Sequence, residues 1–213
     1  FSLPGPHNTR LSKRPRMITA TPLARHTSAW QREMAEAISD PRELLAVLGL
    51  PETLLSAAQQ AAAGFALRVP RSFVARMRPG DLNDPLLRQV LPLGDELAEV
   101  AGYVADPLAE GAAQRAPALL HKYHGRALLV ATGACAVHCR YCFRREFPYD
   151  EQHSAGGRWQ EALRTLQADD TIEELILSGG DPLSLSDARL QSLSDALRPI
   201  AHLRRLRIHT RQP

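Results

Sequence analysis

The chain of 213 residues is 44% hydrophobic and 23% charged, and its formal net charge is +3. Its length allows one or two domains with a sizeable core, its composition is that of an ordinary globular protein, and no apolar run approaches the roughly 20 residues of a membrane span. Residues 1–16 carry a charge of +4, which leaves −1 for the rest of the chain, so we expect neither a membrane nor nucleic acid as a partner.

Residues 1–16 read FSLPGPHNTRLSKRPR, with three prolines and no apolar periodicity, which predicts a disordered leader. The chain begins with Phe1 rather than methionine, and Met17 is a candidate natural start. We therefore expect this leader not to be native. A transit peptide, which is also basic and poor in acids, is the alternative, although the prolines argue against the amphipathic helix that it needs.

Residues 17–110 predict a helical region. Ser28 is a candidate N-cap for a first helix. Behind it, Trp30, Met34 and Ile38 recur at i, i+4 and i+8, which places them on one face of that helix.

Further helices are indicated along the same region. Asp40 and Pro41 form an N-cap followed by proline at the first helical position, and Gly49 suits the end of that helix. Residues 51–63 are rich in Ala, Leu and Gln and predict another helix, and residues 84–85 repeat the Asp-Pro start.

The pattern changes near residue 126 to strands that alternate with helices. This β-α-β-α-β order predicts parallel strands with right-handed crossovers, whose functional groups gather at the carboxyl ends of the strands. Three such strands cannot close a barrel and leave a bare edge, so we expect the front part of a longer protein, with room for a homo-oligomer. The predicted elements are strand 126–132, helix 158–166, strand 174–177, helix 187–197 and strand 206–209.

All three cysteines of the chain, Cys135, Cys139 and Cys142, lie in one short stretch with the spacing C-x3-C-x2-C. Thiolates are the soft ligands that iron–sulfur clusters select. Three of them hold three irons of a cubane cluster and leave the fourth iron open to a small chelating molecule. The spacing, with Tyr141 before the last cysteine, resembles that of the radical S-adenosylmethionine (SAM) superfamily.

The three cysteines have two alternative uses. A structural zinc site with three cysteines and His138 or another histidine is one, but structural zinc more often uses paired C-x2-C knuckles, and no second knuckle is present. A disulfide framework is disfavoured because the cysteine number is odd and all three lie within eight residues. Cysteines unused for bridges indicate a reducing compartment, so we expect a cytoplasmic protein.

Three segments carry a family resemblance: LLHKYHGRALL (119–129), CRYCFRREFPY (139–149) and LILSGGDPL (175–183). They resemble the lysine 2,3-aminomutase family of radical SAM enzymes, and the resemblance runs from about residue 29 to 213. PRELLAVLGL, FALRVPRSFVARM and NDPLLRQVL look most like the branch that makes (R)-β-lysine for elongation factor P.

The resemblance implies a ligand set at the carboxyl ends of the first two strands. Cys135, Cys139 and Cys142 would ligate a [4Fe–4S] cluster. SAM would be held by Tyr141 and by the turn of Ser178, Gly179, Gly180 and Asp181, where the superfamily most often has Glu in place of the aspartate. Glycines at such a turn let the backbone approach a ligand closely.

The resemblance also implies a site for pyridoxal 5′-phosphate (PLP) and substrate. Tyr123 and Arg126 match positions beside PLP, with Arg126 a phosphate partner, and Lys122 stands where relatives have Arg. Arg144 matches the arginine that pairs with the substrate carboxylate, a task that suits a planar guanidinium. The family's Schiff-base lysine lies outside this sequence and Lys13 does not match it either, so we expect this chain alone to be inactive.

The implied activity is that of a radical SAM, PLP-dependent isomerase that converts L-α-lysine to (R)-β-lysine for modification of elongation factor P. An electron donor protein, elongation factor P and its lysyl-transferring enzyme would be its partners. Another radical SAM reaction and a zinc-stabilised module without catalysis stay open as alternatives. The expected fold is α/β, with the helical region 17–110 followed by residues 111–213 as an incomplete radical SAM partial (βα) barrel.

Overall fold

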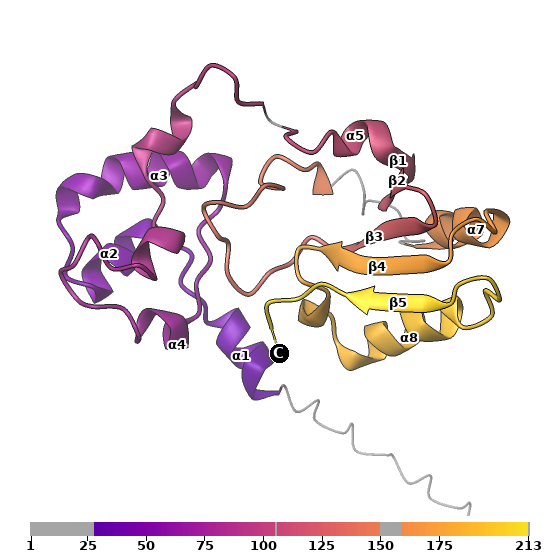
Figure 1. The fold of residues 1–213 in the computed structure, drawn as a ribbon. Helices are drawn as coiled ribbons and strands as arrows, with labels where there is room; N and C mark the ends of the chain where they lie inside the picture. The colour runs from indigo at the N-terminus through magenta and orange to yellow at the C-terminus, as the bar shows by residue number, and fades with distance from the viewer. Residues whose placement is uncertain (1–27, 105, 150–158, 213) are drawn as a thin grey trace, which may run out of the picture.

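The computed structural model describes residues 28–104, 106–149 and 159–212, and Figure 1 shows a helical region beside a β-sheet. The predicted leader 1–16, the alternative start at Met17 and the predicted helix start at Arg158 lie outside the described residues. No helix within the described ranges is long and apolar enough to cross a membrane. The α/β class predicted from the sequence is confirmed.

Helix α1 spans Ala29–Ala35 and begins directly after Ser28, as predicted. The side-chain oxygen of Gln31 accepts a hydrogen bond from the backbone N–H of Ser28 at 3.1 Å. The predicted apolar face is wrong at Ile38, because the helix has ended there and Ile38 pairs with Val69 in an antiparallel β-bridge. Its apolar side chain is buried through that pairing rather than through a helix face.

The other elements of this region follow the cap signals. Asp40 accepts a hydrogen bond from the backbone N–H of Arg42 at 2.9 Å, and Gly49 takes a positive φ of 61° after the helix. Asp84 accepts hydrogen bonds from the backbone N–H groups of Leu86 and Leu87, but only a short 3-10 turn follows, where the sequence predicted a helix. The elements are α2 (Pro41–Val47), η1 (Glu52–Leu54), α3 (Leu55–Gly64), α4 (Arg71–Val74), η2 (Leu87–Gln89), η3 (Gly94–Leu97) and α5 (Glu110–Ala113).

The described residues form one five-stranded open sheet in the order β1-β2-β3-β4-β5. Strands β3, β4 and β5 are parallel, as predicted, while β1 and β2 pair antiparallel. Strand β3 has the predicted bounds, and β4 runs two residues further than predicted, into the glycine turn. The strands are β1 (Gln114–Ala116), β2 (Leu119–Tyr123), β3 (Arg126–Thr132), β4 (Glu174–Gly179) and β5 (Arg205–Ile208).

The β1–β2 hairpin was not predicted from the sequence. Its connection turns at Ala118, a non-glycine residue with a φ of 63°. A positive φ is usually signalled by Gly, Asn or Asp, and none of these occurs between the two strands. Ala118 is instead buried in the core of the sheet, where its backbone carbonyl accepts a hydrogen bond from Val130 at 2.8 Å.

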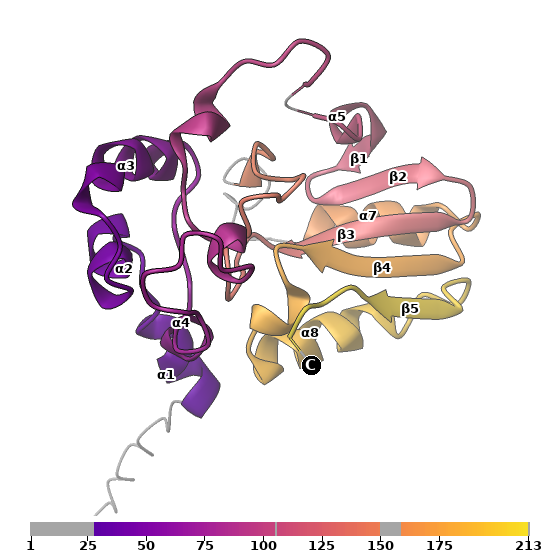
Figure 2. The same ribbon diagram turned by 60° about the vertical axis from the view of Figure 1, so that its left-hand side comes forward.

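Helices α7 (Gln160–Ala168) and α8 (Asp187–Leu197) cover one face of the sheet, behind the strands in Figure 2. Leu166 of α7 and Leu193 of α8 are buried in the same apolar core as Leu129 and Leu175 of the central strands. The 3-10 turn η4 (Pro182–Ser184) follows β4. The carboxyl ends of the parallel strands therefore face the helical region, with the cysteine loop between the two (Figure 1).

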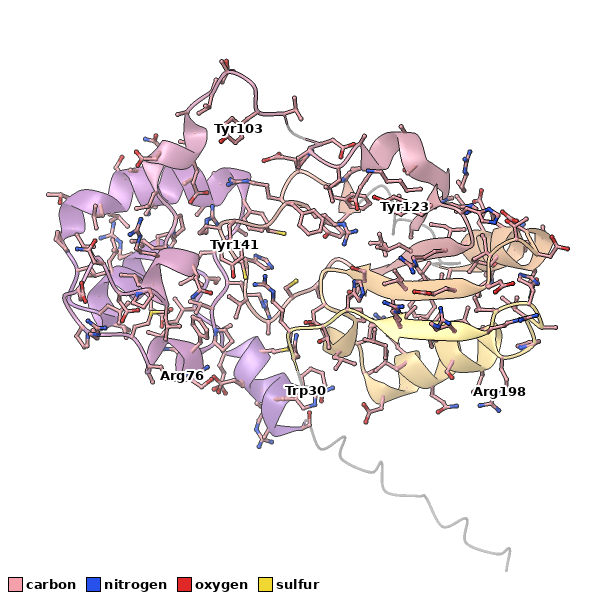
Figure 3. The ribbon with its side chains drawn as sticks, in the orientation of Figure 1. Trp30, Arg76, Tyr103, Tyr123, Tyr141 and Arg198 are labelled. Carbon is pink, nitrogen blue, oxygen red and sulfur yellow. The ribbon has the colours of Figure 1, made fainter. Side chains whose placement is uncertain are left out.

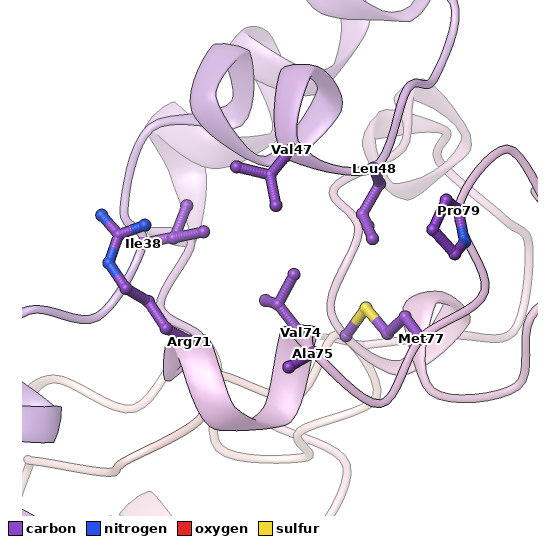
Figure 4. A pocket seen from close by; sticks show the side chains of 8 residues that line it. All are labelled: Ile38, Val47, Leu48, Arg71, Val74, Ala75, Met77 and Pro79. Atoms are coloured by element: carbon purple, nitrogen blue, oxygen red, sulfur yellow. The ribbon is translucent and has the colours of Figure 1, made fainter.

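The helical region has a small pocket of its own, with a volume of about 180 Å³ (Figure 4). Its lining is apolar except for Arg71, which is paired with Glu43. It shares no lining residue with the cysteine loop, so it does not contribute to the site described below. The lining residues are Ile38, Val47, Leu48, Arg71, Val74, Ala75, Met77 and Pro79.

Candidate functional site

The cysteine loop and the glycine turn lie side by side because they follow neighbouring parallel strands. Thr132 at the end of β3 is in register with Gly179 at the end of β4. The backbone N–H of Gly180 donates to the carbonyl of Thr132, and the N–H of Asp181 donates to the carbonyl of Ala134, both at 2.7 Å. The prediction that both loops open onto the same mouth is therefore confirmed.

The two glycines are required by this contact within the chain. A Cβ atom on Gly179, whose φ is +115°, would lie 2.4 Å from the carbonyl oxygen of Thr132. A Cβ atom on Gly180 would lie 2.3 Å from the carbonyl oxygen of Ala134. The glycines were predicted to allow close approach of the backbone to a ligand, whereas in the structure they allow the cysteine loop to pack against the turn.

A cleft of about 1310 Å³ opens between the helical region and the carboxyl ends of β3, β4 and β5. All three cysteines line it, together with Ser178, both glycines of the turn, Asp181 and residues 208–212. Tyr141 stands in this space between the two halves in Figure 3. Pockets for small molecules usually measure about 300–1,000 Å³, so the cleft is large enough for a cluster and a second ligand.

The three cysteines give the cleft a set of thiolate ligands of the kind that iron–sulfur clusters use. Cys135, Cys139 and Cys142 are half-buried free thiols on one wall of the cleft. In the part of the chain that the structure describes, no three His, Cys, Asp or Glu side chains converge to hold one ion, whereas a cubane binds each thiolate through a different iron. Burial raises the pKa of the Cys135 thiol to about 12, and the Asp181 carboxylate acts in the same direction.

His138, the histidine considered as a fourth zinc ligand, is engaged with the helical region. Its Nδ1 lies 2.9 Å from the carbonyl oxygen of Ala66, and its ring stacks on Phe65 with centroids 5.4 Å apart. Its backbone N–H donates to the carbonyl of Arg68 at 2.9 Å. Burial lowers the pKa of His138, so the ring is held as a neutral packing element.

Arg140, between the second and third cysteines, fastens the loop to the helical region. Its Nε and Nη2 pair with the carboxylate of Glu96, with a shortest distance of 2.6 Å. Its Nη1 donates to the carbonyl of Phe65 at 2.6 Å, and its guanidinium lies 4.9 Å from the centre of the Phe65 ring. This anchor was not predicted, because no local sequence pattern pairs an arginine with a glutamate 44 residues away.

Arg144, predicted to bind the substrate carboxylate, lines the cleft but already has partners. Its Nε and Nη2 pair with Glu110 of α5, with a shortest distance of 2.6 Å, and its Nη1 donates to the Ser178 hydroxyl at 3.0 Å. Only 5% of Arg144 is exposed. No pattern in the sequence indicated that Glu110 belongs to the site. Its carboxylate binds one edge of the Arg144 guanidinium, so that the other edge faces Ser178.

Asp181, predicted to hold SAM, ties the glycine turn to the end of β5. Its Oδ1 accepts hydrogen bonds from the backbone N–H of Leu183 at 3.0 Å and from the Thr210 hydroxyl at 2.6 Å. Its Oδ2 accepts from the backbone N–H of Arg211 at 2.7 Å. Asp181 as a whole residue is 5% exposed, so contact with a ligand would fall mainly to the neighbouring backbone.

The two residues predicted beside PLP lie at the opposite end of the sheet from the cysteine loop. Tyr123 is 63% exposed at the end of β2 (Figure 3). Arg126 begins β3 and pairs with Glu174 at 3.1 Å. Register places Arg126 on the same face as Ser178 but four strand positions away, about 13 Å at the usual rise per residue. The structure therefore does not bring these residues into contact with the cysteine loop.

Glu174 at that end of the sheet is surrounded by three arginines. Arg126, Arg205 and Arg207 all pair with its carboxylate, at 3.1, 2.8 and 2.9 Å. A hydrogen bond from Arg205 is the main reason why the pKa of Glu174 is lowered. The group keeps two positive charges in excess, which is the kind of environment that suits a phosphate.

Comparisons with known proteins match both the segment that carries the cysteines and most of the chain. Residues 124–204, which include the cysteines and the glycine turn, match the family model described as a 4Fe-4S single cluster domain. The L-lysine 2,3-aminomutase of Escherichia coli (strain K12) is 49% identical over 185 residues, covering 86% of this chain and 54% of the relative.

Two further relatives with the same name give the same result. That of Haemophilus influenzae is 45% identical over 198 residues, covering 93% of this chain and 59% of the relative. That of Buchnera aphidicola is 42% identical over 189 residues, covering 88% of this chain and 56% of the relative. The chain thus spans a little over half the length of these curated relatives.

Proposed function

This chain belongs to the lysine 2,3-aminomutase family, and from that premise we propose that the intact protein converts L-α-lysine to (R)-β-lysine as a radical SAM, PLP-dependent isomerase. The observation that carries the proposal is the convergence of three cysteines and the glycine turn on one cleft, at the carboxyl ends of parallel strands. When bound, the cluster and SAM would supply a radical, and PLP would supply an electron sink for migration of the amino group.

The residues of this chain would bind and orient these groups. Cys135, Cys139 and Cys142 would hold the cluster, and Tyr141 with the turn of residues 178–181 would hold SAM. Their place between the helical region and the strand ends supports this division, since ligands placed there are shielded from water on two sides. Exclusion of water protects a reactive radical from side reactions.

The substrate and PLP would lie on the face of the sheet shared by Arg126 and Ser178. Arg144 would bind the lysine carboxylate through Nη1, on the edge of the guanidinium that faces Ser178 rather than Glu110, and the carboxylate would replace the hydrogen bond to Ser178. Arg126 would bind the phosphate of PLP beside Tyr123, supported by the excess positive charge around Glu174. The distance of roughly 13 Å along the strands between Arg126 and Ser178 is compatible with PLP and lysine spanning it.

We further propose a cellular role in modification of elongation factor P. The support is the resemblance of residues 41–50, 65–77 and 83–91 to the branch that makes β-lysine for this factor. Its lysyl-transferring enzyme and an electron donor protein would be the partners, and the cytoplasm the location. The exposed β5, whose Leu206 and Ile208 are 44% and 46% exposed, leaves room for association with further protein, including a second copy.

Anaerobic reconstitution of the intact protein with iron and sulfide tests the proposal. We expect about four irons and matching sulfide per chain, and β-lysine formed from lysine only when SAM, PLP and a reductant are all present. The Cys139→Ala variant should lose both the cluster and the product, because two thiolates do not retain a cubane. Zinc without sulfide would overturn the proposal, and turnover of SAM without PLP binding would favour another radical SAM reaction.

A further inference from the structure

Arg211, just after β5, reaches across the cleft to the cysteine loop. Its Nη1 lies 3.2 Å from Sγ of Cys139 and 2.8 Å from the hydroxyl oxygen of Tyr141. Its guanidinium carbon lies 5.2 Å from the centre of the Tyr141 ring. No role was predicted for this arginine, because it follows Cys139 by 72 positions and belongs to no recognised motif.

The backbone of Arg211 is fixed by the glycine turn rather than by the cysteine loop. Its N–H donates to Oδ2 of Asp181, and the hydroxyl of the preceding Thr210 donates to Oδ1 of the same carboxylate. Gln212 adds a hydrogen bond to the Ser184 hydroxyl at 2.8 Å. The arginine is therefore presented toward Cys139 from an element that does not itself depend on the cysteines.

Tyr141 is oriented to accept the hydrogen bond from Arg211. Its hydroxyl donates to Oε1 of Gln89 in the helical region at 3.2 Å, which leaves an oxygen lone pair for the arginine. The cation–π contact with the Tyr141 ring and the hydrogen bond to its hydroxyl together hold the Arg211 guanidinium in place. Within the described residues, Cys139 is the cysteine whose sulfur receives a hydrogen bond from a cation.

A cation that donates to a cysteine sulfur favours the more negative redox state of a cluster held by that sulfur. Hydrogen bonds to the sulfurs are among the features that set the reduction potential of iron–sulfur clusters. Arg211 is exposed at the mouth of the cleft, so solvent screens its long-range charge and the direct contact must carry the effect.

We propose that Arg211 tunes the iron–sulfur cluster by donating a hydrogen bond to Cys139, so that the cluster accepts an electron more readily. The proposal rests on the cluster assigned under the proposed function. The electron comes from a low-potential one-electron donor, a reducing protein in the cell or dithionite in the test tube. Arg211 is a positioning residue in this role, because it acts through the cysteine.

The test is a redox titration of the reconstituted intact protein, followed by electron paramagnetic resonance. We expect Arg211→Gln to keep the iron and sulfide content and to lower the equilibrium constant for one-electron reduction by about tenfold, a shift of about 59 mV for a one-electron couple. Arg76→Gln is the matched control, because Arg76 lines the same cleft but stacks on Phe73 instead of contacting a cysteine. It should leave the potential unchanged.

A second measurement keeps the test decisive if Arg211→Gln fails to assemble a cluster. In protein labelled with ¹⁵N-arginine, the reduced cluster should show a nitrogen hyperfine coupling that is absent from Arg211→Lys. An unchanged potential, equal shifts in the Arg211 and Arg76 variants, or no arginine coupling in the wild type would overturn the inference. Failure of the wild type to assemble any cluster would instead refute the proposed function.

Discussion

Gly180 shows at the scale of single atoms how the sequence assembles the site. The carbonyl of Ala134 lies where a Cβ atom on Gly180 would have to be, and the carbonyl of Thr132 lies in the same way against Gly179. A Gly-Gly pair after a strand therefore allows two backbones to meet before any ligand arrives. A requirement for glycine at these two positions was predicted from the sequence. The reason for it, the close approach of the chain that follows the neighbouring strand, is visible only in the structure.

We expect Gly180→Ala to destabilise the fold by about 1–3 kcal/mol, as overpacking does, and to lower the iron content. The added methyl group would push the start of the cysteine loop away from the turn. Urea unfolding and iron analysis measure the two effects. Gly64→Ala is the control, because a Cβ there meets no atom within 4 Å, and a fall in stability for Gly180→Ala no larger than in this control would contradict the explanation.

Arg144 distinguishes substrate binding from a purely structural role. In the intact enzyme, Arg144→Lys keeps the charge but loses the planar fork, so turnover of lysine should fall about 10- to 100-fold, the value of a hydrogen bond to a charged group. Iron content and SAM cleavage should change little. Arg76→Lys serves as the control within the same cleft. Equal losses of iron, SAM cleavage and lysine turnover would mean that Arg144 serves only to link Glu110 with Ser178.

Among the elements, the parallel strands were predictable and the hairpin was not. Apolar runs such as residues 126–132 and 174–179 are buried on both faces of a sheet, so composition alone identifies them. The β1–β2 connection contains none of the residues that usually signal a turn. Ile38 is buried through its β-bridge with Val69 rather than on the face of a helix. These features depend on contacts between distant residues, as do the partners of Arg140, Arg144 and Arg211, which carry no local pattern.

The anchor between the cysteine loop and η3 should give a defined pH dependence. Burial acts to raise the pKa of Glu96, but hydrogen bonds from Arg140, the Leu93 N–H and Arg145 outweigh it, and the net shift is downward. A carboxyl with a lowered folded-state pKa stabilises the fold above its unfolded value, and this contribution is lost as the pH falls through the folded value.

We therefore expect Glu96→Gln to be destabilised relative to the wild type by a constant amount between pH 7 and 5. The difference should shrink as the pH falls below about 4.5, where the Glu96 carboxyl of the unfolded wild type begins to bind protons while that of the folded protein does not yet. Urea unfolding at several pH values measures it. Glu52→Gln is a suitable control, because Glu52 forms only an exposed ion pair with Arg42. A difference that stays constant down to pH 3 would show that the charge on Glu96 is not what anchors the loop.

On the scale of the whole molecule, the cysteine loop connects two apolar cores. One core lies under the sheet and the other within the helical region. The backbone N–H groups of His138 and Arg140 in the loop donate hydrogen bonds to the helical region, at the carbonyls of Arg68 and Gln89. The Arg140 side chain adds an ion pair with Glu96. A ligand that rigidifies this loop must therefore also affect the helical region, since binding to the native state stabilises whatever is coupled to it.

Cluster assembly should consequently increase amide hydrogen-exchange protection beyond the loop that binds it. We expect slower exchange in residues 61–68 and 87–97, which accept hydrogen bonds from the loop, when the reconstituted protein is compared with the cluster-free form. The first turns of α8, which share no such bond, should exchange at the same rate in both. In Arg140→Met the added protection of residues 61–65 should disappear even if a cluster still forms, because the bonds to Ala61 and Phe65 are lost while His138 still holds Ala66 and Arg68. Protection confined to residues 133–145 in the wild type would show that the two halves respond independently.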